Sequence, residues 1–514
     1  MHSTTAPTPA SAPAPGSAPP SSVDEAAGER IDAADLALCL DVLRRAEQLP
    51  EEHPDALALR RATARLFKAV KKQRRLDRRA AVSAQDAAVV AATATGSPQR
   101  IDDETAGLPL VSQTRGASAG TLLRPRACYI CKEPYAQVDA FYHQLCPACA
   151  ELNHAKRDAR TDLTGRRALL TGGRAKIGMY IALRLLRDGA HTTITTRFPR
   201  DAVRRFSSMP DAHEWIDRLT VVGIDLRDPA QVVALADEVA AAGPLDILIN
   251  NAAQTVRRSA GAYAPLVEAE SAPLPEGHLP RLVTFEHASD AHPAALVRSV
   301  GTTAVAHHDD DTSTAAGADR LTAAALRAGS TSLERLTTGA SGTIDAGGLL
   351  PDLHDTNSWV ATVDQVDALE MLEVQLCNET APFILVSRLR PSLAASPARR
   401  TYIVNVSAME GVFSRGYKGP GHPHTNMAKA AVNMLTRTSA AELARDGILM
   451  TSVDTGWITD ERPHPTKVRL AAEGFHAPLD LVDGAARVYD PIVRGEAGDD
   501  VHGVFLKDYR PSGW

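Results

Sequence analysis

Ala168-Leu-Leu-Thr-Gly-Gly-Arg-Ala-Lys-Ile-Gly178 decides the fold of this chain. The stretch begins as a short apolar strand, passes through a glycine turn and opens a helix with an apolar face. Gly172 and Gly173 let the backbone turn tightly and approach a ligand closely, and the amino end of the helix then presents free N–H groups to a pyrophosphate. Gly178 lets the helix pack close to its strand. This order of elements predicts a dinucleotide site.

Downstream of the turn, short apolar strands alternate with helical patterns. We expect strands at 168–171, 192–196, 219–225, 245–250, 402–406, 449–453 and 503–506, and helices at 176–188, 363–390, 425–445 and 481–493. Such alternation is typical of a parallel sheet covered by helices on both faces. The predicted fold class is therefore α/β, with a doubly wound parallel sheet (a Rossmann fold) over residues 161–514.

The alternation lapses between about residues 255 and 355, where Ala, Thr, Ser, Gly and His dominate. So long a stretch without periodicity is improbable inside a compact domain unless it forms a lid or a disordered insert. We therefore predict a partly disordered insert at 255–355. Its first part, with Tyr263, Leu266 and Leu279, is the candidate for an ordered segment near the ligand.

The part of the chain before the sheet divides into four predicted segments. Residues 1–24 consist mainly of Ala, Pro, Ser and Thr, which is typical of a disordered tail. Residues 25–95 carry apolar stripes at helical spacing and include a basic run that either faces water or binds a negatively charged partner. A linker rich in Gly, Ser and Thr follows at 96–121, and residues 122–160 form a small cysteine-containing module.

Two close cysteine pairs, Cys128-Tyr-Ile-Cys131 and Cys146-Pro-Ala-Cys149, define that module. Four thiolates at this spacing can close a tetrahedral zinc site and so fix a segment that has too little core to fold alone. Because all four ligand positions are filled, we predict structural rather than catalytic zinc. The alternative is two incidental or reactive pairs. We expect chelation to unfold this module without emptying the nucleotide site.

Composition argues against several classes of protein. The net charge is −6, so there is no global basic field that would favour nucleic acid as the main partner. No apolar run reaches the roughly eighteen residues that a membrane-spanning helix needs. The amino terminus lacks a charged start followed by an apolar core, which is the pattern of an export signal. We therefore expect no membrane partner and a cytoplasmic location, where close cysteines favour metal over disulfides.

Over about residues 163–510, the insert excepted, the chain resembles the short-chain dehydrogenase/reductase family. Thr171-Gly-Gly-Arg-Ala-Lys-Ile-Gly178 resembles the family's glycine turn, with Lys176 in place of the middle glycine. Asp225-Leu226 resembles the family's Asp-Leu that contacts adenine. Asn250-Asn251-Ala252-Ala253 resembles its Asn-Asn-Ala-Gly motif.

Two further positions extend the resemblance. Asn378 falls where the family keeps a structural and catalytic asparagine, and Thr455-Gly456 falls where the family usually has Pro-Gly. The resemblance implies that the cofactor is bound by the following residues: Thr171, Gly172, Gly173, Arg174, Lys176, Ile177, Gly178, Arg197, Asp225, Leu226, Asn250, Asn251, Ala252, Lys429, Thr455 and Gly456.

Charge around the turn predicts which cofactor is bound. A carboxylate at the end of the second strand would hold a ribose hydroxyl and repel a 2′-phosphate. That place reads Thr195-Thr196-Arg197, and Arg174 and Lys176 stand in the turn itself. Three cations without a carboxylate favour NADP, with NAD as the other candidate. The alternative is that one or more of these cations simply faces water.

The catalytic positions depart from the family pattern. In the family a tyrosine passes a proton to or from the substrate oxygen, a lysine four residues later lowers the tyrosine pKa, and a serine orients the carbonyl. Lys429 matches the lysine, but Thr425 stands at the tyrosine position. Ala408 stands at the serine position, and Ser407 lies one place earlier.

A threonine hydroxyl is too weak an acid to replace a phenol, so we expect the proton donor in the loop before Thr425. His422 lies seven residues before Lys429, which resembles the Tyr-x6-Lys spacing of related enoyl reductases, and histidine titrates near neutral pH. Tyr417 is a second candidate, and the alternative is that these loop residues have no role. The predicted catalytic set comprises Asn378, Ser407, His422, Thr425 and Lys429.

The leading functional hypothesis is an NADP-dependent oxidoreductase that transfers a hydride between nicotinamide and a small-molecule carbonyl, alcohol or enoyl substrate. One alternative is an NAD(P)-binding protein with little or no catalysis that acts as a sensor. Another is a scaffold that uses the zinc module or the basic helix to bind partners. The resemblance also implies a homodimer or a tetramer.

Overall fold

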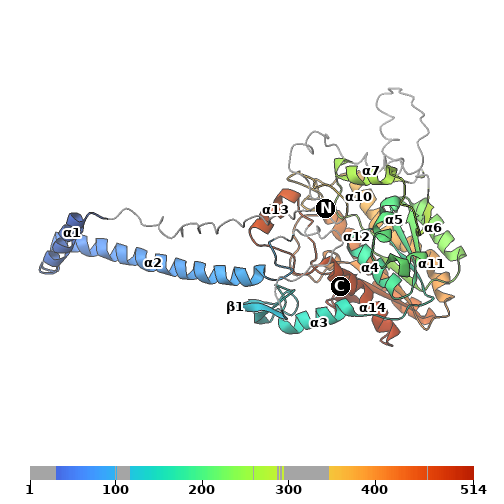
Figure 1. Ribbon diagram of the computed structural model, residues 1–514, viewed down its shortest axis with the longest axis horizontal. Coiled ribbons are helices and arrows are strands. Elements are labelled where there is room, and N and C mark those ends of the chain that lie inside the picture. The colour runs from blue at the N-terminus through green and yellow to red at the C-terminus, as the bar shows by residue number, and fades with distance from the viewer. Residues whose placement is uncertain are drawn as a thin grey trace, which may run out of the picture. The chain divides into compact units, whose positions relative to one another are not determined.

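The computed structural model describes residues 31–98, 100, 116–258, 260–285, 289, 292–293, 347–459 and 461–514 (Figure 1). The predicted tail at 1–24 and much of the predicted insert lie outside these residues. Contacts divide the chain into two compact units, Met1–Ala81 and Val82–Trp514. Among the described helices, none has both the length and the apolarity that crossing a bilayer requires.

Two helices occupy the segment predicted to be helical. α1 (Ala33–Ala46) begins at Asp32, whose carboxylate accepts hydrogen bonds from two N–H groups of the first turn. α2 (Pro54–Ala91) starts with proline, which suits the first helical position because its missing N–H has no intrahelical partner there. Large apolar side chains along α2 stay exposed, among them Phe67 at 68%. The unit boundary falls within α2.

The second unit starts with the last turns of α2 and a small hairpin. Strand β1 (Ser118–Ala127) pairs antiparallel with β2 (Pro134–Asp139), and α3 (Pro147–Asp158) follows. β1 begins inside the segment predicted to be a linker. Leu122 is the one buried residue of β1, so backbone pairing rather than an apolar pattern holds this strand.

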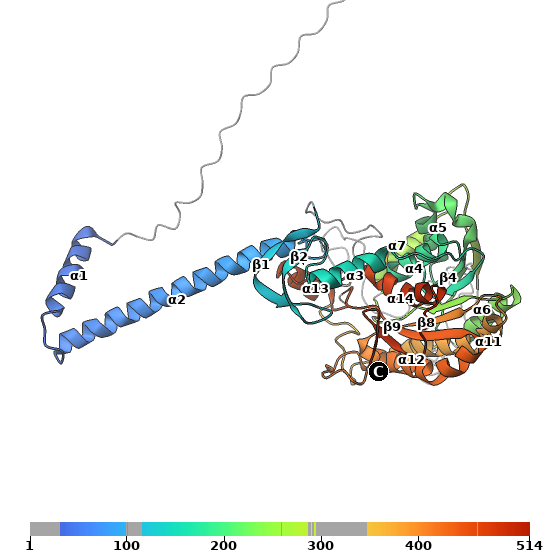
Figure 2. The same cartoon turned by 90° about the horizontal axis from the view of Figure 1, so that it is seen from below.

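A nine-stranded sheet forms the centre of this unit (Figures 1 and 2). Its order is β11-β10-β9-β8-β6-β3-β4-β5-β7, and every neighbouring pair except β10 and β11 is parallel. The strands are β3 (Arg167–Leu170), β4 (His191–Thr196), β5 (Leu219–Gly223), β6 (Ile247–Asn250), β7 (Arg281–Thr284), β8 (Thr401–Ser407), β9 (Ile448–Asp454), β10 (Phe505–Lys507) and β11 (Arg510–Ser512). Strand order reverses at β3, between β4 and β6. The predicted doubly wound α/β fold is confirmed.

Helices cover both faces of this sheet, as Figure 2 shows. The helices that follow β3 in the chain are α4 (Lys176–Arg187), α5 (Pro199–Ser207), α6 (Pro229–Ala241), α7 (Ala264–Ser271), α10 (Ala368–Gln375), α11 (Ala381–Ala394), α12 (Pro423–Leu443), α13 (His464–Ala472) and α14 (Leu481–Glu496). Leu169 and Leu170 are neighbours in β3 and enter different cores, because successive side chains of a strand point to opposite faces. Leu170 packs with α4 and α14, and Leu169 packs with α6 and α11.

Two segments differ from the sequence expectations. The helix expected at 363–390 is α10 and α11 joined by a π-helical turn at Leu376–Thr380. The predicted insert contains α7 and the edge strand β7, which pairs with β5. β7 has no fully buried residue, so it carries no apolar run that would mark it in the sequence.

Candidate functional site

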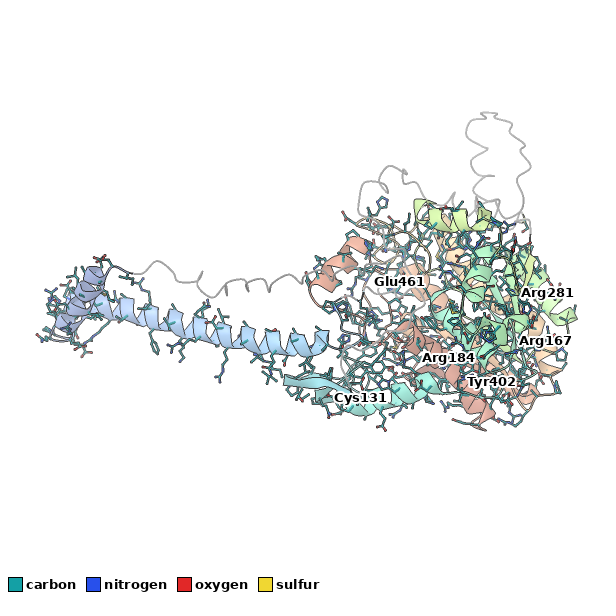
Figure 3. All side chains as sticks on the ribbon, viewed as in Figure 1. Cys131, Arg167, Arg184, Arg281, Tyr402 and Glu461 are labelled. Carbon is teal, nitrogen blue, oxygen red and sulfur yellow. The ribbon has the colours of Figure 1, made fainter. Side chains whose placement is uncertain are left out.

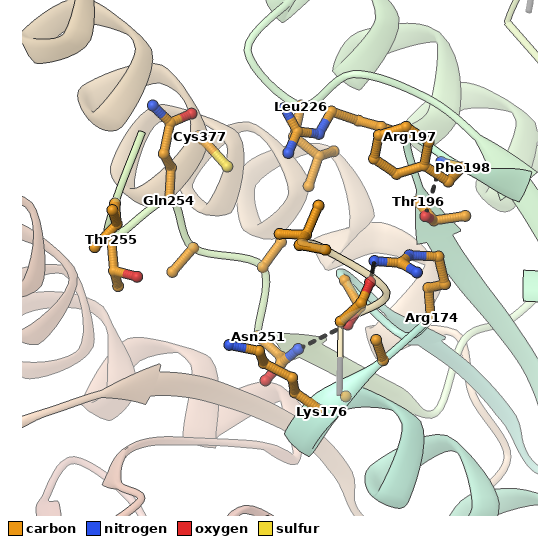
Figure 4. A pocket seen from close by; sticks show the side chains of 18 of the residues that line it. Arg174, Lys176, Thr196, Arg197, Phe198, Leu226, Asn251, Gln254, Thr255 and Cys377 are labelled. Carbon is orange, nitrogen blue, oxygen red and sulfur yellow. Dashed lines mark hydrogen bonds between the residues drawn. The ribbon is translucent and has the colours of Figure 1, made fainter. Parts of the chain in front are cut away.

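A cavity of about 380 Å³ opens at the carboxyl end of the sheet (Figure 4). Its walls come from the glycine turn after β3, the end of β4, the residues after β5 and the loop Asn251–Arg258 after β6. In open α/β sheets ligands bind at this edge, where the strand order reverses. Tyr263 and Leu266, from the predicted insert, also line the cavity.

Close packing explains the glycines of the turn. Gly172 has φ +71°, and a Cβ there would lie 2.9 Å from Ala252 Cα. A Cβ on Gly178 would lie 1.9 Å from Gly172 O. Lys176 keeps φ +53°, a left-handed conformation that costs a non-glycine residue about 1–2 kcal/mol. Ala175 caps α4 without a side-chain hydrogen bond, so the first N–H groups of the helix can bind a ligand.

The Asn-Asn-Ala-Ala motif ties the glycine turn to the end of β6. Asn251 Nδ2 donates to Thr171 O at 3.1 Å and to Gly172 O at 3.0 Å (Figure 4). Thr171 Oγ1 accepts from the N–H groups of Asn251 and Ala252, both at 3.0 Å. Asn250 Nδ2 donates to Asn405 Oδ1 on β8 at 2.8 Å. These bonds fix the turn in the shape that leaves the cavity open.

The predicted cofactor residues divide into two groups. Those that line the cavity are Gly172, Arg174, Lys176, Ile177, Gly178, Arg197, Asp225, Leu226, Asn251 and Ala252. The other predicted cofactor residues do not line it, and they are Thr171, Gly173, Asn250, Lys429, Thr455 and Gly456.

Charge at the end of β4 is less one-sided than the sequence indicated. Arg174 Nη1 lies 2.5 Å from Asp201 Oδ2 on α5, and Arg205 Nε lies 2.7 Å from the same oxygen. The Arg197 guanidinium lies 5.8 Å from the ring centroids of both Phe198 and Tyr263. The sequence analysis counted no carboxylate here, but Asp201 supplies one. Three guanidinium groups still outnumber it.

Asp225 is fully engaged by its neighbours. Arg227 Nη2 lies 2.6 Å from Asp225 Oδ2, and His292 Nε2 lies 3.2 Å from the same oxygen. Burial alone would raise the pKa of Asp225, but the Arg227 charge outweighs it and holds this pKa well below its ordinary value. Arg227 Nη1 also donates to Glu373 Oε1 at 2.8 Å. This ionic network forms one wall of the cavity.

The residues at the family's catalytic positions are buried beside the cavity rather than lining it. Lys429 Nζ donates to Val406 O at 2.8 Å, and burial lowers the pKa of Lys429 to about 8. Ser407 Oγ and Thr425 Oγ1 are buried and find no hydrogen-bond partner in the described part of the chain. Buried polar atoms are normally paired, so unpaired ones at this place call for an explanation.

Asn378 positions the loop that closes the cavity. It lies in the π-helical turn, and its Oδ1 accepts from Gln254 N at 2.7 Å while its Nδ2 donates to Gln254 O at 2.9 Å. Such turns interrupt helices mostly at functional sites. Because Gln254 itself lines the cavity, Asn378 acts through it.

His422, the proton donor predicted from the sequence, does not line the cavity, and neither does His424. The His422 ring stacks on Trp359 with centroids 3.9 Å apart, and its Nδ1 lies 2.7 Å from Trp359 O. Tyr417 is 77% exposed. His424 was not predicted, yet it is 1% exposed and its Nε2 lies 3.7 Å from Glu370 Oε1. Neither ring nitrogen of His424 hydrogen-bonds to a described residue. In the sequence, the only indication of His424 was that it directly precedes Thr425, the residue at the tyrosine position.

The four cysteines of the predicted module converge. The Sγ atoms of Cys128, Cys131, Cys146 and Cys149 all lie within 4.8 Å of one another. Tetrahedral zinc with bonds of about 2.3 Å places its sulfurs about 3.8 Å apart. Cys146 N also donates to Cys128 Sγ at 3.3 Å, as backbone amides do toward thiolate ligands. The donor set fits a divalent metal such as zinc.

This four-cysteine module packs against the cavity wall. Tyr129 Oη accepts from Trp457 N at 2.9 Å. Arg100 Nη1 donates to Ala477 O at 2.6 Å, and its Nη2 donates to Leu479 O at 2.5 Å. Ile458, which lines the cavity, shares a core with Leu122, Tyr142 and other apolar residues of the module. The module and the nucleotide domain therefore form one structural unit.

Fold and cavity together define a doubly wound α/β protein with a ligand-sized cavity at the point where its strand order reverses. Residues 166–266 match the family of short chain dehydrogenases. The chain is 30% identical over 384 residues to "Uncharacterized protein R665" of Acanthamoeba polyphaga mimivirus, which covers 72% of each chain. It is 42% identical over 91 residues to a "Probable oxidoreductase" of Streptomyces antibioticus, which covers 18% of this chain and 30% of that protein.

Solved structures give a weaker likeness. A short chain dehydrogenase from Burkholderia cenocepacia in complex with NADP aligns with a TM-score of 0.40 and 19% identity, covering 67% of this chain and 97% of that one. Within this chain, the match to the short chain dehydrogenase family spans the glycine turn and the strands β3 to β6.

Proposed function

We propose that this chain is an oxidoreductase that uses NADP to act on a small-molecule carbonyl, alcohol or enoyl substrate. The observation that carries the proposal is the cavity where the glycine turn, the amino end of α4 and the loop Asn251–Arg258 meet. The name of the Streptomyces antibioticus relative, "Probable oxidoreductase", agrees with it. When bound, NADPH supplies the hydride, so the protein has to supply orientation and a proton.

Preference for NADP over NAD is supported by charge at the end of β4. Arg174 and Arg197 both line the cavity, Arg174 shares Asp201 with Arg205, and the Arg197 side chain pairs with no carboxylate within 4 Å in the described part of the chain, so Arg197 is the cation offered to a 2′-phosphate. The fluorescence of bound NADPH and NADH during titration measures this preference. We expect NADPH to bind at least tenfold more tightly, and tighter binding of NADH would overturn the assignment.

A matched pair of variants tests the same point. Arg197→Ala should weaken NADPH binding and leave NADH binding within about threefold, because only the 2′-phosphate contact is lost. Arg388→Ala, whose guanidinium pairs with Asp237 on the surface at 2.8 Å, should change neither affinity.

Of the predicted catalytic residues, we keep Asn378, Ser407, Thr425 and Lys429 and replace His422 by His424. Lys429 and the unpaired hydroxyls lie at the end of β8 and the start of α12. We propose that His424, which lies 3.7 Å from Glu370, exchanges the proton that a tyrosine exchanges elsewhere in the family, and that Lys429 stabilises the charge that develops. Histidine suits this role because its two ring nitrogens can donate and accept a proton.

We further propose that the four cysteines hold one structural zinc ion, since four thiolates leave no open coordination position. The reduced thiolates that this requires agree with the cytoplasmic location expected from the sequence. Metal analysis of the purified protein should find one zinc per chain, and substituting Cys131 and Cys146 by serine should abolish it. Protein purified under reducing conditions with no bound metal would overturn the assignment.

A second function is supported by the burial of the catalytic positions and by the missing tyrosine. In that case the chain binds the nucleotide as a sensor or a structural ligand without turnover. Purified protein that binds NADPH but oxidises it with none of a panel of carbonyl and enoyl substrates would favour this function over the first.

A further inference from the structure

Two adjacent arginines that follow the Asn-Asn-Ala-Ala motif line the same cavity. Arg257 and Arg258 lie in the loop after β6, and their side chains are only 17% and 12% exposed. Arg257 N donates to Ser358 Oγ at 3.0 Å, which holds this part of the loop in place. Neither arginine belongs to the set that the sequence analysis assigned to the cofactor.

Each guanidinium group lies near a carboxylate without reaching hydrogen-bond distance. Arg257 Nε lies 3.8 Å from Glu373 Oε2, and Arg258 Nη2 lies 4.0 Å from Glu461 Oε2, which is labelled in Figure 3. These separations exceed hydrogen-bond length. Arg257 Nε is buried and hydrogen-bonds to no described residue. A guanidinium carries five N–H donors, and burying them unpaired is costly, so this pair is built for a ligand.

Glu373, the carboxylate that lies nearest Arg257, is already engaged by other donors. Glu373 already accepts hydrogen bonds from Arg227 Nη1 at 2.8 Å and from Gln254 Nε2 at 3.0 Å. Arg227, in contrast to Arg257, lies 2.6 Å from Asp225 Oδ2 and is satisfied within the protein. Arg257 and Arg258 are therefore the two arginines of this wall whose carboxylate partners lie beyond hydrogen-bond distance.

The phosphates of the cofactor have their own partners in the cavity. The glycine turn and the amino end of α4 suit the pyrophosphate, and Arg174 and Arg197 at the end of β4 suit a 2′-phosphate. Arg257 and Arg258 come from a different wall, the loop after β6. They are thus available for a second anion in the same cavity.

We propose that Arg257 and Arg258 bind the carboxylate of the substrate, so that the substrate is an oxo acid or an unsaturated acid. A guanidinium matches a carboxylate with two parallel N–H···O bonds, which gives orientation as well as affinity. This inference rests on the proposed function, because it names the class of substrate that enters the proposed site.

Benzoate and methyl benzoate serve as probes that differ in one negative charge. Isothermal titration of both into the cofactor-free and the NADPH-loaded protein should show binding of benzoate only. Arg257→Gln and Arg258→Gln should each weaken benzoate binding at least tenfold and leave NADPH affinity within threefold. Arg258→Lys should keep only part of the affinity for benzoate, because lysine retains the positive charge but lacks the two parallel N–H donors of a guanidinium group. Arg388→Gln, at an exposed surface pair, is the control.

Three results would overturn the proposal. Equal binding of benzoate and its ester would show that charge is not recognised, and unchanged benzoate binding by both variants would place the anion elsewhere. A tenfold loss of NADPH affinity in the variants would assign the arginines to the cofactor. If the wild-type protein bound no NADPH, the proposed function would be overturned instead. The anion site would still be supported in that case if the wild type bound benzoate and both glutamine variants did not.

Discussion

The residue whose environment departs most from its usual one at the catalytic end is Lys429. Burial lowers its pKa from 10.5 to about 8, and its Nζ retains one described hydrogen bond, to Val406 O. In the unfolded chain the pKa is higher, so between pH 8 and about 10 the unfolded state binds more protons than the folded state. The unfolding free energy should therefore rise with pH over this window.

Urea unfolding of the wild type and of Lys429→Met at pH 7.5 and pH 10 measures the effect of this lysine. Burying the charged Lys429 lowers the free energy of unfolding by about 3 kcal/mol at most, from a pKa shift of this size. This destabilisation should be present at pH 7.5 and largely gone at pH 10. Other groups titrate in both proteins, so the difference between them isolates Lys429. A difference that does not change with pH would contradict the expectation.

His424 and His422 provide a matched comparison, since they lie two positions apart at the start of α12. We expect His424→Phe to lower NADPH oxidation by about a hundredfold or more, the usual effect of losing a general acid. His422→Phe should keep the stack on Trp359 and most of the activity. The affinity for NADPH should stay within severalfold in both. Loss of activity in the His422 variant alone would show that His422 is the proton donor, as the sequence analysis predicted.

Single residues also show where sequence reasoning ends. Gly172 and Gly178 could be predicted because their roles depend on neighbours in the same turn and on one following loop. Asp201 and Glu370 could not, because each acts by meeting a charge from another element: Asp201 meets Arg174, and Glu370 meets His424. No pattern in the sequence states which surface of α5 or α10 faces the site.

At the scale of elements, strands and helices with a buried face were predictable. β3, β5 and β6 carry the apolar runs that mark them, and β4 carries the β-branched Thr and Ile residues that favour strands. β1 and β7 were missed because main-chain pairing at a sheet edge leaves little trace in side-chain polarity. The π-helical turn at Leu376–Thr380 was also missed, since an extra residue in a helix does not interrupt an apolar pattern.

The four-cysteine module was predicted to be independent of the nucleotide site, and its contacts argue otherwise. Tyr129 Oη accepts a hydrogen bond from Trp457 N, and Ile458 packs on the module and also lines the cavity. Chelation of zinc, or the change Cys131→Ser with Cys146→Ser, should therefore weaken NADPH binding at least tenfold. Fluorescence titration measures the affinity, and Cys39→Ser, an exposed cysteine of α1, is the control. Unchanged affinity after complete metal loss would show that the module is autonomous.

At the scale of the whole molecule, the division after Ala81 makes a prediction about which part of the chain the site requires. The last turns of α2 belong to the second unit, where Asp86 accepts hydrogen bonds from Leu123 N at 2.6 Å and Arg124 N at 3.3 Å. Val90 is 7% exposed in the core shared with the four-cysteine module. Deleting residues 1–81 removes none of these contacts, but deleting residues 1–91 removes them all.

The shorter deletion should keep NADPH affinity within threefold and leave the melting temperature of the second unit unchanged. The longer deletion leaves two backbone N–H groups without their carboxylate, at about 1.5–3 kcal/mol each, and loses the burial of Val90. A fall in melting temperature of roughly 5 °C or more should follow. Thermal unfolding monitored by circular dichroism, with and without NADPH, compares the two fragments. If the deletion of 1–81 alone abolished NADPH binding, the nucleotide site would depend on the first unit as well, and the division after Ala81 would not be a functional one.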